Sequence, residues 1–175
     1  MKLFVFLLLA CGVSGGVAGD AESLKGISGI WVLVENLDPD LLKAGLTKGE
    51  LRTDIEDRLR ESGIAVKPPS ASGSGPFLYL ELTDISVPAG GKRKSKPNAK
   101  SNGRHEGTAL YVRLELQQAV ALKRAPASSL LSDTWRQSMI GYAEPSRAGE
   151  TARGWVKELT DRFIKSYLMA NPPAE

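Results

Sequence analysis

The sequence is poor in the residue types that carry most enzyme chemistry. It has one cysteine, Cys11, and one histidine, His105, among 175 residues. A serine triad needs a histidine to relay the proton, and His105 lies in a glycine-bounded stretch with no predicted strand or helix to hold it. Neither the phosphate-loop signature nor the dinucleotide-binding glycine pattern follows a predicted strand. With so few thiols and imidazoles a zinc site is disfavoured, and we predict no catalytic residues, no metal and no cofactor.

Long apolar runs are also lacking. The longest, from Leu3 to Val13, follows Lys2 and precedes small residues around Ala18 and Gly19. This is the layout of a secretory signal peptide, and the run is shorter than the roughly 20 residues that a membrane-spanning helix needs. We therefore predict a signal peptide over residues 1–19, export to the periplasm or the medium, and a mature chain without a transmembrane segment.

Cys11 lies inside this run, and two interpretations stay open. "LLAC" loosely resembles the lipobox of bacterial lipoproteins, in which the cysteine becomes the acylated first residue. Leu9 fits that motif poorly and only a short apolar segment precedes the cysteine, so the pattern favours cleavage near Ala18 or Gly19 over a lipid anchor at Cys11. A chain cleaved there has no cysteine, which excludes disulfides, thiolate nucleophiles and thiol redox chemistry.

Acidic residues are almost missing from the segment 89–107, where Glu106 is the only one. Its six basic residues are Lys92, Arg93, Lys94, Lys96, Lys100 and Arg104, in a chain whose net charge is only +3. Nucleic-acid-binding surfaces interleave aromatic side chains with basic ones, and this segment has no aromatic residue, so we expect no nucleic-acid partner.

The same segment cannot bury enough apolar area to offset the entropy lost on ordering. We predict a mobile loop over residues 89–107 that joins adjacent antiparallel strands. Two roles stay open for it. It is either a solvated insertion without a ligand, or an anion-binding loop that docks weakly onto phosphorylated glycolipid or anionic lipid of the cell envelope.

Two amphipathic helices are predicted. Thr47 is followed three residues later by Glu50, which is the spacing of a capping box, and the apolar periodicity that follows predicts a helix over residues 48–62 that ends at Gly63. The C-terminal segment carries one apolar stripe, which Asn171 ends. The members of the stripe are Ala152, Trp155, Val156, Leu159, Phe163, Tyr167 and Leu168.

Short apolar runs at 26–36 and 64–66 are typical of strands, and apolar and polar residues alternate along 78–82 and 110–116. Alternation of period two indicates one buried face and one wet face, and a further strand is expected over 133–143. The order of elements is then β α β β β β α. The simplest packing lays both helices on the apolar face of a mainly antiparallel sheet of four to five strands, which is a two-layer α+β sandwich. Residues 20–175 then form a single domain.

Alternation places Tyr79, Tyr111 and Arg113 on the wet face of the sheet. Two interpretations stay open for them. Cross-strand pairing with charged neighbours accounts for these side chains without a ligand. Alternatively, an open sheet face that carries aromatic residues and an arginine is a docking surface for a partner.

Several segments resemble an uncharacterised family of small exported bacterial proteins. They are "GLTKGELRTDIEDRLRESGIAV", "LELQQAVAL", the "DTW" that ends at Trp135, and "FIKSYLMANP". The resemblance covers most of the mature chain, with the basic insertion as its clearest departure. Its motifs are architectural, so it implies no catalytic residues. The order of elements is also similar to that of TolB-type N-terminal domains and of the lipopolysaccharide-assembly lipoprotein, which implies binding or assembly, although fold alone does not determine function.

These observations predict a non-catalytic binding or assembly module of the bacterial cell envelope, whose partner is an envelope protein or an anionic envelope surface. Two alternatives stay open. One is an enzyme that acts on envelope glycans through carboxylates alone, which requires two carboxylates about 5 to 9 Å apart in a cleft. The other is a structural subunit that pairs with a partner through an open sheet edge.

Overall fold

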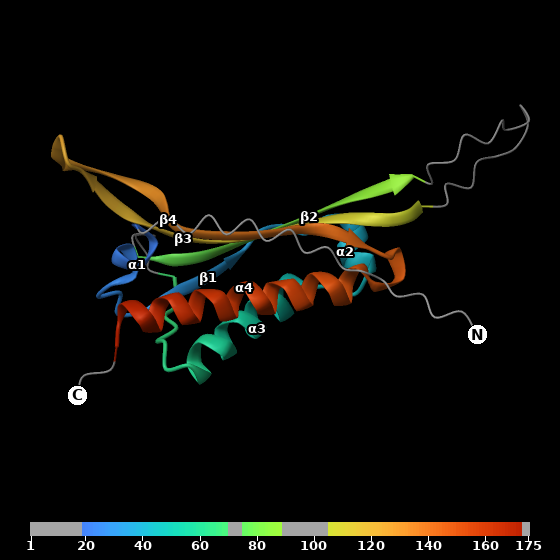
Figure 1. Cartoon of the computed structure of the whole chain (residues 1–175), viewed down its shortest axis with the longest axis horizontal. Helices are drawn as coiled ribbons and strands as arrows, with labels where there is room; N and C mark the ends of the chain where they lie inside the picture. Colours follow the sequence, from blue (N-terminus) through green and yellow to red (C-terminus); the bar gives the residue numbers. More distant parts are fainter. Residues whose placement is uncertain (1–18, 70–74, 89–104, 173–175) are drawn as a thin grey trace, which may run out of the picture.

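The protein folds into two layers, a sheet and a pair of long helices (Figure 1). The structure is a computed structural model that describes residues 19–69, 75–88 and 105–172. The helices α3 (Lys48–Glu61) and α4 (Ala148–Ala170) pack side by side on one face of the sheet. The α+β sandwich with two helices on one face is therefore confirmed. The six basic residues of the predicted anion-binding loop and the predicted signal segment up to residue 18 lie outside the described residues.

The sheet has four strands in the order β1-β2-β3-β4. They are β1 (Trp31–Val34), β2 (Phe77–Pro88), β3 (His105–Leu122) and β4 (Ala125–Ala143). β1 runs parallel to β2, and the other two pairs are antiparallel. A parallel pair needs a long crossover, and here it contains α2 (Pro39–Lys43) and α3. A short 3-10 helix, Pro145–Arg147, leads from β4 into α4.

Two predicted strands are shorter than the sequence suggested. The strand predicted over 26–36 is confined to β1, and the one predicted over 64–66 is reduced to a single parallel bridge between Ile30 and Val66. The N–H of Lys67 still donates to the carbonyl of Ile30 at 2.9 Å. Pro68 and Pro69 follow, and they have no backbone N–H with which to extend the pairing. The element order with four consecutive strands after the first helix is therefore corrected to three.

Other elements are longer than the sequence suggested, or were not predicted at all. His105 pairs with Pro88 across a register shift, so residues 105–107 belong to β3 and not to the predicted loop, and His105 is part of a strand. β4 starts at Ala125, because it pairs with β3 far beyond the predicted segment 133–143. The helix α1 (Gly19–Leu24) was not predicted, and its Leu24 is fully buried in the core.

The predicted ends of α3 are confirmed. The backbone N–H of Glu50 donates to the Thr47 hydroxyl at 3.2 Å. That hydroxyl in turn donates to the Glu50 carboxylate at 2.8 Å, which is a bond between two side chains. At the other end Gly63 has a φ of 78°, in the left-handed region. The N–H of Ile64 donates to the carbonyl of Leu59 at 2.9 Å, which is the Schellman arrangement.

Replacing Thr47 with alanine is expected to lower the free energy of unfolding by about 1 kcal/mol, because it removes the acceptor for the Glu50 N–H. This corresponds to a melting temperature about 2 to 4 °C lower, measured by circular dichroism. Thr53→Ala is the matched control, since Thr53 is exposed inside the same helix and alanine has the higher helix propensity. Equal melting temperatures for the two variants would contradict the cap.

The stripe on α4 faces the sheet except at its end. Ala152, Val156, Leu159 and Phe163 are buried, whereas Leu168 is 44% exposed, so its place in the predicted core stripe was wrong. Successive residues turn by about 100° around a helix. In the last turn Tyr167 takes the inward position and donates its hydroxyl proton to the carbonyl of Ile27 at 2.5 Å.

Asn171 ends α4, as predicted, and also ties this end of the helix to α1. Its side-chain amide donates to the carbonyls of Leu24 at 2.9 Å and Tyr167 at 3.0 Å, and its side-chain oxygen accepts from the N–H of Gly26 at 2.7 Å. On the other side of α1, the Ser23 hydroxyl donates to a β4 carbonyl at 2.8 Å. The first and last described elements are thus joined at one end of the sheet.

Candidate functional site

The face of the sheet opposite the helices is the candidate site, and we call it the open face (Figure 1). Tyr79 on β2 and Tyr111 and Arg113 on β3 lie on this face, each half-buried. Tyr79 stands opposite Glu115 in the β2–β3 register, and Arg113 stands opposite Glu81. The structure therefore brings Tyr79 and Arg113 together as diagonal neighbours, while Tyr111 lies one step further along β3.

Charged side chains form a ladder across the middle of the open face. Arg113 pairs with Glu81 on β2, and its Nε lies 3.2 Å from the Glu115 carboxylate at angles that do not suit a hydrogen bond. Arg136 on β4 lies 3.8 Å from Glu115 and 3.2 Å from Asp133. Glu115 is only 4% exposed although it points away from the helices. The ladder satisfies most of its own charge, which favours a cross-strand structural role for Arg113.

Tyr79 is also held within the chain. Its hydroxyl donates to the carboxylate of Glu35, just beyond the end of β1. Burial first, and then the hydrogen bond and the negative charge of Glu35, raise the pKa of Tyr79 to about 12. Tyr79 therefore stays protonated at neutral pH and anchors β1 to β2.

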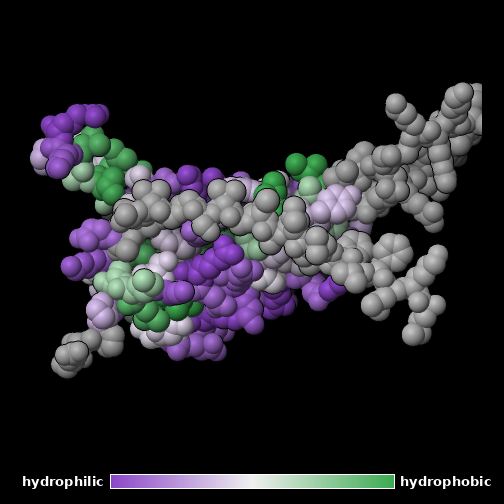
Figure 2. Space-filling model, viewed as in Figure 1, coloured by the Kyte–Doolittle hydropathy of each residue, from purple (hydrophilic) through white to green (hydrophobic). Residues whose placement is uncertain are grey.

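Apolar side chains gather on the open face beyond the ladder, and we call Ile85, Tyr111, Ile140 and Tyr142 the apolar end. Ile140 is 80% exposed, Ile85 65% and Tyr142 57%. Tyr111 stands opposite Ile140, and the Tyr142 ring covers Gly107, where a Cβ atom would overlap it. Hydrophobic surface is visible on this helix-free side in Figure 2.

Three members of the apolar end were not predicted from the sequence, namely Ile85, Ile140 and Tyr142. The alternation that placed Tyr79 and Tyr111 on the wet face also places Ile85 on it, if continued along the strand. Ile140 and Tyr142 alternate in the same way along β4. The signal was present, but the predicted alternation ended before Ile85, and no faces were assigned along the strand predicted over 133–143.

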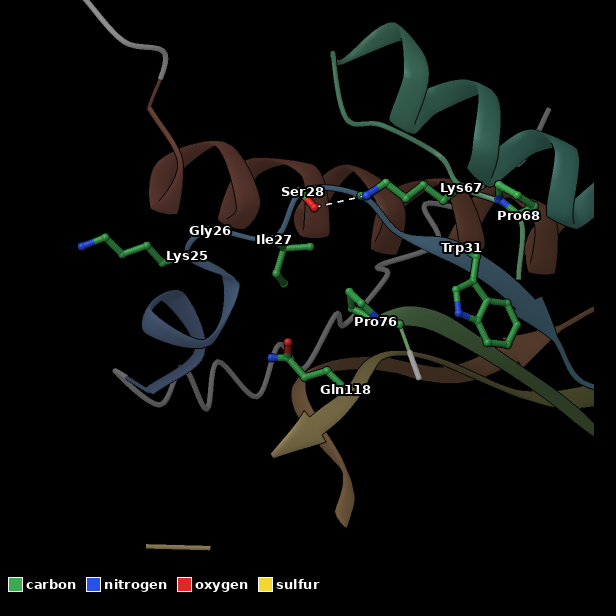
Figure 3. A pocket seen from close by; sticks show the side chains of 11 residues that line it. Lys25, Gly26, Ile27, Ser28, Trp31, Lys67, Pro68, Pro76 and Gln118 are labelled. Carbon is green, nitrogen blue, oxygen red and sulfur yellow. Dashed lines mark hydrogen bonds between the residues drawn. The ribbon is translucent and has the colours of Figure 1, made fainter. Parts of the chain in front are cut away.

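A pocket of about 390 Å³ lies where the turn after α1 meets the segment before β2 (Figure 3). The Lys67 ammonium donates to the Ser28 hydroxyl at 3.2 Å across it, while Lys25 extends away. The indole N–H of Trp31 is buried without a hydrogen-bond partner. Because the lysine and the hydroxyl already bind each other and the N–H is closed to solvent, this pocket offers a ligand few free groups.

The groove between α3 and α4 is bridged by ion pairs. Arg153 binds Asp54 through two hydrogen bonds of 2.6 and 2.8 Å, and Arg58 binds Asp161 at 2.5 Å. These pairs join the two helices and engage the carboxylates of Asp54 and Asp161. Within the described residues, no group of three or more histidine, cysteine, aspartate or glutamate side chains is arranged to hold a metal ion.

Two aspartates line another pocket, of about 270 Å³, between α2 and the sheet. They are Asp40 and Asp84. Burial first, and then the negative charges of Asp38 and Asp40, raise the pKa of Asp84, and one of its carboxylate oxygens is buried without a hydrogen-bond partner. A carboxylate-dependent reaction in this pocket would use Asp40 and Asp84.

Asp84→Asn is expected to raise the stability of the fold at pH 7. The pKa of Asp84 is higher in the folded state than in the unfolded state, so ionisation penalises the fold above the folded pKa and has no effect below the unfolded pKa. The gain in melting temperature should therefore disappear in acid, near the ordinary aspartate pKa of about 4. Thermal melts of both proteins across this pH range test the expectation.

Glu56→Gln is the control of opposite sign. Burial would raise the pKa of Glu56, but hydrogen bonds from Arg52 and Arg60 outweigh it and the pKa is lowered. The charge of Glu56 therefore stabilises the fold at pH 7, and this contribution is lost as the pH falls through the folded pKa. A lower melting temperature for Asp84→Asn at pH 7, as expected for Glu56→Gln, would contradict our account of Asp84.

No family model matches the chain, and no curated protein sequence matches it. Among solved structures, the chain is similar to the rare lipoprotein B of Shewanella oneidensis, with 16% sequence identity, a TM-score of 0.37, and coverage of 79% of this chain and 94% of that chain. A likeness of this degree carries no argument about the site. None of the described helices is both long enough and apolar enough to cross a membrane.

Proposed function

We propose that this protein is a non-catalytic binding or assembly module of the bacterial cell envelope and that it holds a partner protein against the open face of its sheet. The signal-like pattern at the N-terminus supports the compartment. The arrangement of the layers supports the binding role, because the long helices cover one face of the sheet only.

The observation that carries the proposal is the apolar end. Ile85 on β2 and Ile140 and Tyr142 on β4 are all more than half exposed, and these two strands flank β3. A cluster of this kind on a monomer marks an interaction site. The charged ladder lies beside it. An apolar centre next to polar and charged groups is the composition of protein interfaces.

The three residues named from the sequence have different parts in this proposal. Tyr111 belongs to the contact surface through its place in the apolar end. Tyr79 and Arg113 are engaged with Glu35 and Glu81, so they hold the shape of the open face and meet the partner at its margin. The basic residues between 92 and 104 lie outside the described residues, and anion binding by them stays a prediction from the sequence.

A photo-crosslinking amino acid at position 140 tests the proposal in the native envelope. We expect one dominant crosslinked protein, and we expect Tyr142→Glu to abolish the crosslink without lowering the melting temperature. The control is the same crosslinker at Lys157, which is exposed on the helix layer. No crosslink at position 140, or the same products at both positions, would contradict docking on the open face.

A carboxylate-dependent enzyme is the second candidate, and the raised pKa of Asp84 beside Asp40 favours it. A glycosidase needs one carboxylic acid kept protonated and a second carboxylate ionised. Release of soluble sugar from purified cell-wall glycan, abolished by Asp84→Asn, would support this candidate and contradict the binding role. A stable dimer that is lost when Pro replaces Ser138 on the outer strand β4 would support pairing through the sheet edge instead.

A further inference from the structure

The far end of the β3–β4 hairpin stands free of the sheet. β2 ends its pairing with β3 at the pair Phe77–Gln117, so the following residues of β3 pair with β4 alone. We call this two-stranded part, residues 118–132, the ribbon. Figure 1 shows it curving away from the sheet and from the helix layer at one end of the molecule.

The ribbon carries apolar side chains on both of its faces. Val120 pairs with Leu130, and the neighbouring pair is Ala119 with Leu131. Successive pairs point to opposite faces, so each face has one leucine. Leu130 is 42% exposed and Leu131 55%. Strands with apolar residues on both faces are normally buried on both sides, and within the described residues nothing covers these leucines fully.

The turn of the ribbon is cationic. Lys123 and Arg124 are exposed at its tip, and no acidic residue occurs between residues 118 and 132. Figure 2 shows the hydrophobic surface of the ribbon ending in a strongly hydrophilic tip. A ligand of this surface must therefore offer apolar groups to the leucines along the strands and negative charge to the cations at the turn.

We propose that the ribbon is a peripheral membrane-binding element that inserts into the interface of an anionic lipid bilayer. Its five paired positions beyond the sheet span about 15 Å, whereas the headgroup layer is about 5 to 8 Å thick. A ribbon inserted obliquely contacts lipid on both of its faces and places both leucines at the boundary with the acyl chains. The long side chains of Lys123 and Arg124 reach back to the lipid phosphates.

A second structural feature lies at the same end of the molecule. The last turn of α4 exposes Leu168 by 44% and Met169 by 73%. Asn171 ties this turn to α1, and the Ser23 hydroxyl ties α1 to β4 at the base of the ribbon. The ribbon and the end of α4 therefore present apolar side chains from one connected end, while the apolar end of the open face lies at the opposite end of the strands.

Sedimentation of the full chain with lipid vesicles tests the proposal. We expect binding to vesicles of phosphatidylcholine with 30% phosphatidylglycerol and little binding to phosphatidylcholine alone. Each cation near an anionic surface changes partitioning about fivefold, so Lys123→Gln with Arg124→Gln should weaken binding about 25-fold. Leu130→Ser with Leu131→Ser should also abolish most of it. The matched control is Leu42→Ser, because Leu42 is 52% exposed on α2 at the other end of the molecule.

A depth measurement separates insertion from surface attraction. Leu131→Trp should gain fluorescence quenching by lipids brominated on the acyl chains, beyond the quenching of the native tryptophans, and Leu42→Trp should not. Melting temperatures within 2 °C of the parent value show that the variants are folded. Absence of vesicle binding, binding that survives both ribbon variants, or a ribbon-dependent dimer without vesicle binding would each overturn the proposal.

Discussion

Phe163→Ala is expected to lower the free energy of unfolding by about 3 to 5 kcal/mol. Phe163 is fully buried between α4 and the sheet. Its ring meets Trp135 edge to face at a centroid distance of 5.0 Å and lies 6.2 Å from the ring of Tyr167. Alanine at this position loses the buried area and both aromatic contacts, and it leaves a cavity at the centre of the core.

Leu168→Ala is the matched control on the same helix. The sequence places both residues on one stripe, but Leu168 is 44% exposed in the structure, so we expect a loss below about 1 kcal/mol. Urea denaturation followed by tryptophan fluorescence measures both variants. Equal losses would mean that α4 is rotated from the orientation described here.

Glu115→Ala is expected to cost about 2 kcal/mol. The Glu115 carboxylate is the acceptor at the centre of the ladder, where Arg113 approaches at 3.2 Å and the Gln117 side-chain amide donates to it at 3.2 Å. Removing one partner of a buried ion pair costs about 3 to 5 kcal/mol. The loss should be smaller here because the Arg113 side chain is 28% exposed and can regain water.

Arg136→Ala on the opposite side of Glu115 is the comparison. The Arg136 side chain is 56% exposed and lies 3.8 Å from Glu115, so its loss should cost less than about 1 kcal/mol. The cost of Glu115→Ala should also change little between 0.05 and 0.5 M salt, since buried pairs are weakly screened. Equal costs for the two substitutions would show that Glu115 is exposed in solution.

The strands and helices that the sequence predicted well are those with a long periodic pattern. The alternation along β2 and β3 assigned the buried face correctly because an error of one residue would expose every leucine. The capping pair Thr47 and Glu50 located the start of α3 to the residue. Both signals are local, and neither requires knowledge of which elements are neighbours.

The features that the sequence did not predict depend on distant contacts. α1 is six residues long and is held by Ser23, Leu24 and the amide of Asn171, and a helix this short has no stability of its own. The parallel placement of β1 beside β2 leaves no pattern in either strand. The ribbon was not predicted because apolar and polar residues alternate poorly along "AVALKRAPASSLL". In the structure the pairing of β3 with β4 simply continues into this segment.

The partner role of Tyr79, Tyr111 and Arg113 stays a prediction, but their surroundings are now specified. Alternation gave their common face and could not reveal that Glu35 and Glu81 bind two of them. Cross-strand register decides which charges meet, and register is set by the whole sheet. The apolar end, to which Tyr111 belongs, also contains two isoleucines that a search for charged or aromatic residues alone overlooks.

The bond between Asn171 and the start of the chain determines when folding can finish. Leu24 and Gly26 are bound by a residue that leaves the ribosome about 145 positions later, so the bonds that tie α1 to α4 cannot form while the chain is being synthesised. The antiparallel pairs β2–β3 and β3–β4 can form as soon as their strands emerge. The bonds of α1 to Asn171, in contrast, must wait for the last turn of α4. In a chain with this order of assembly, the contacts that join α1 to α4 are among the last to form.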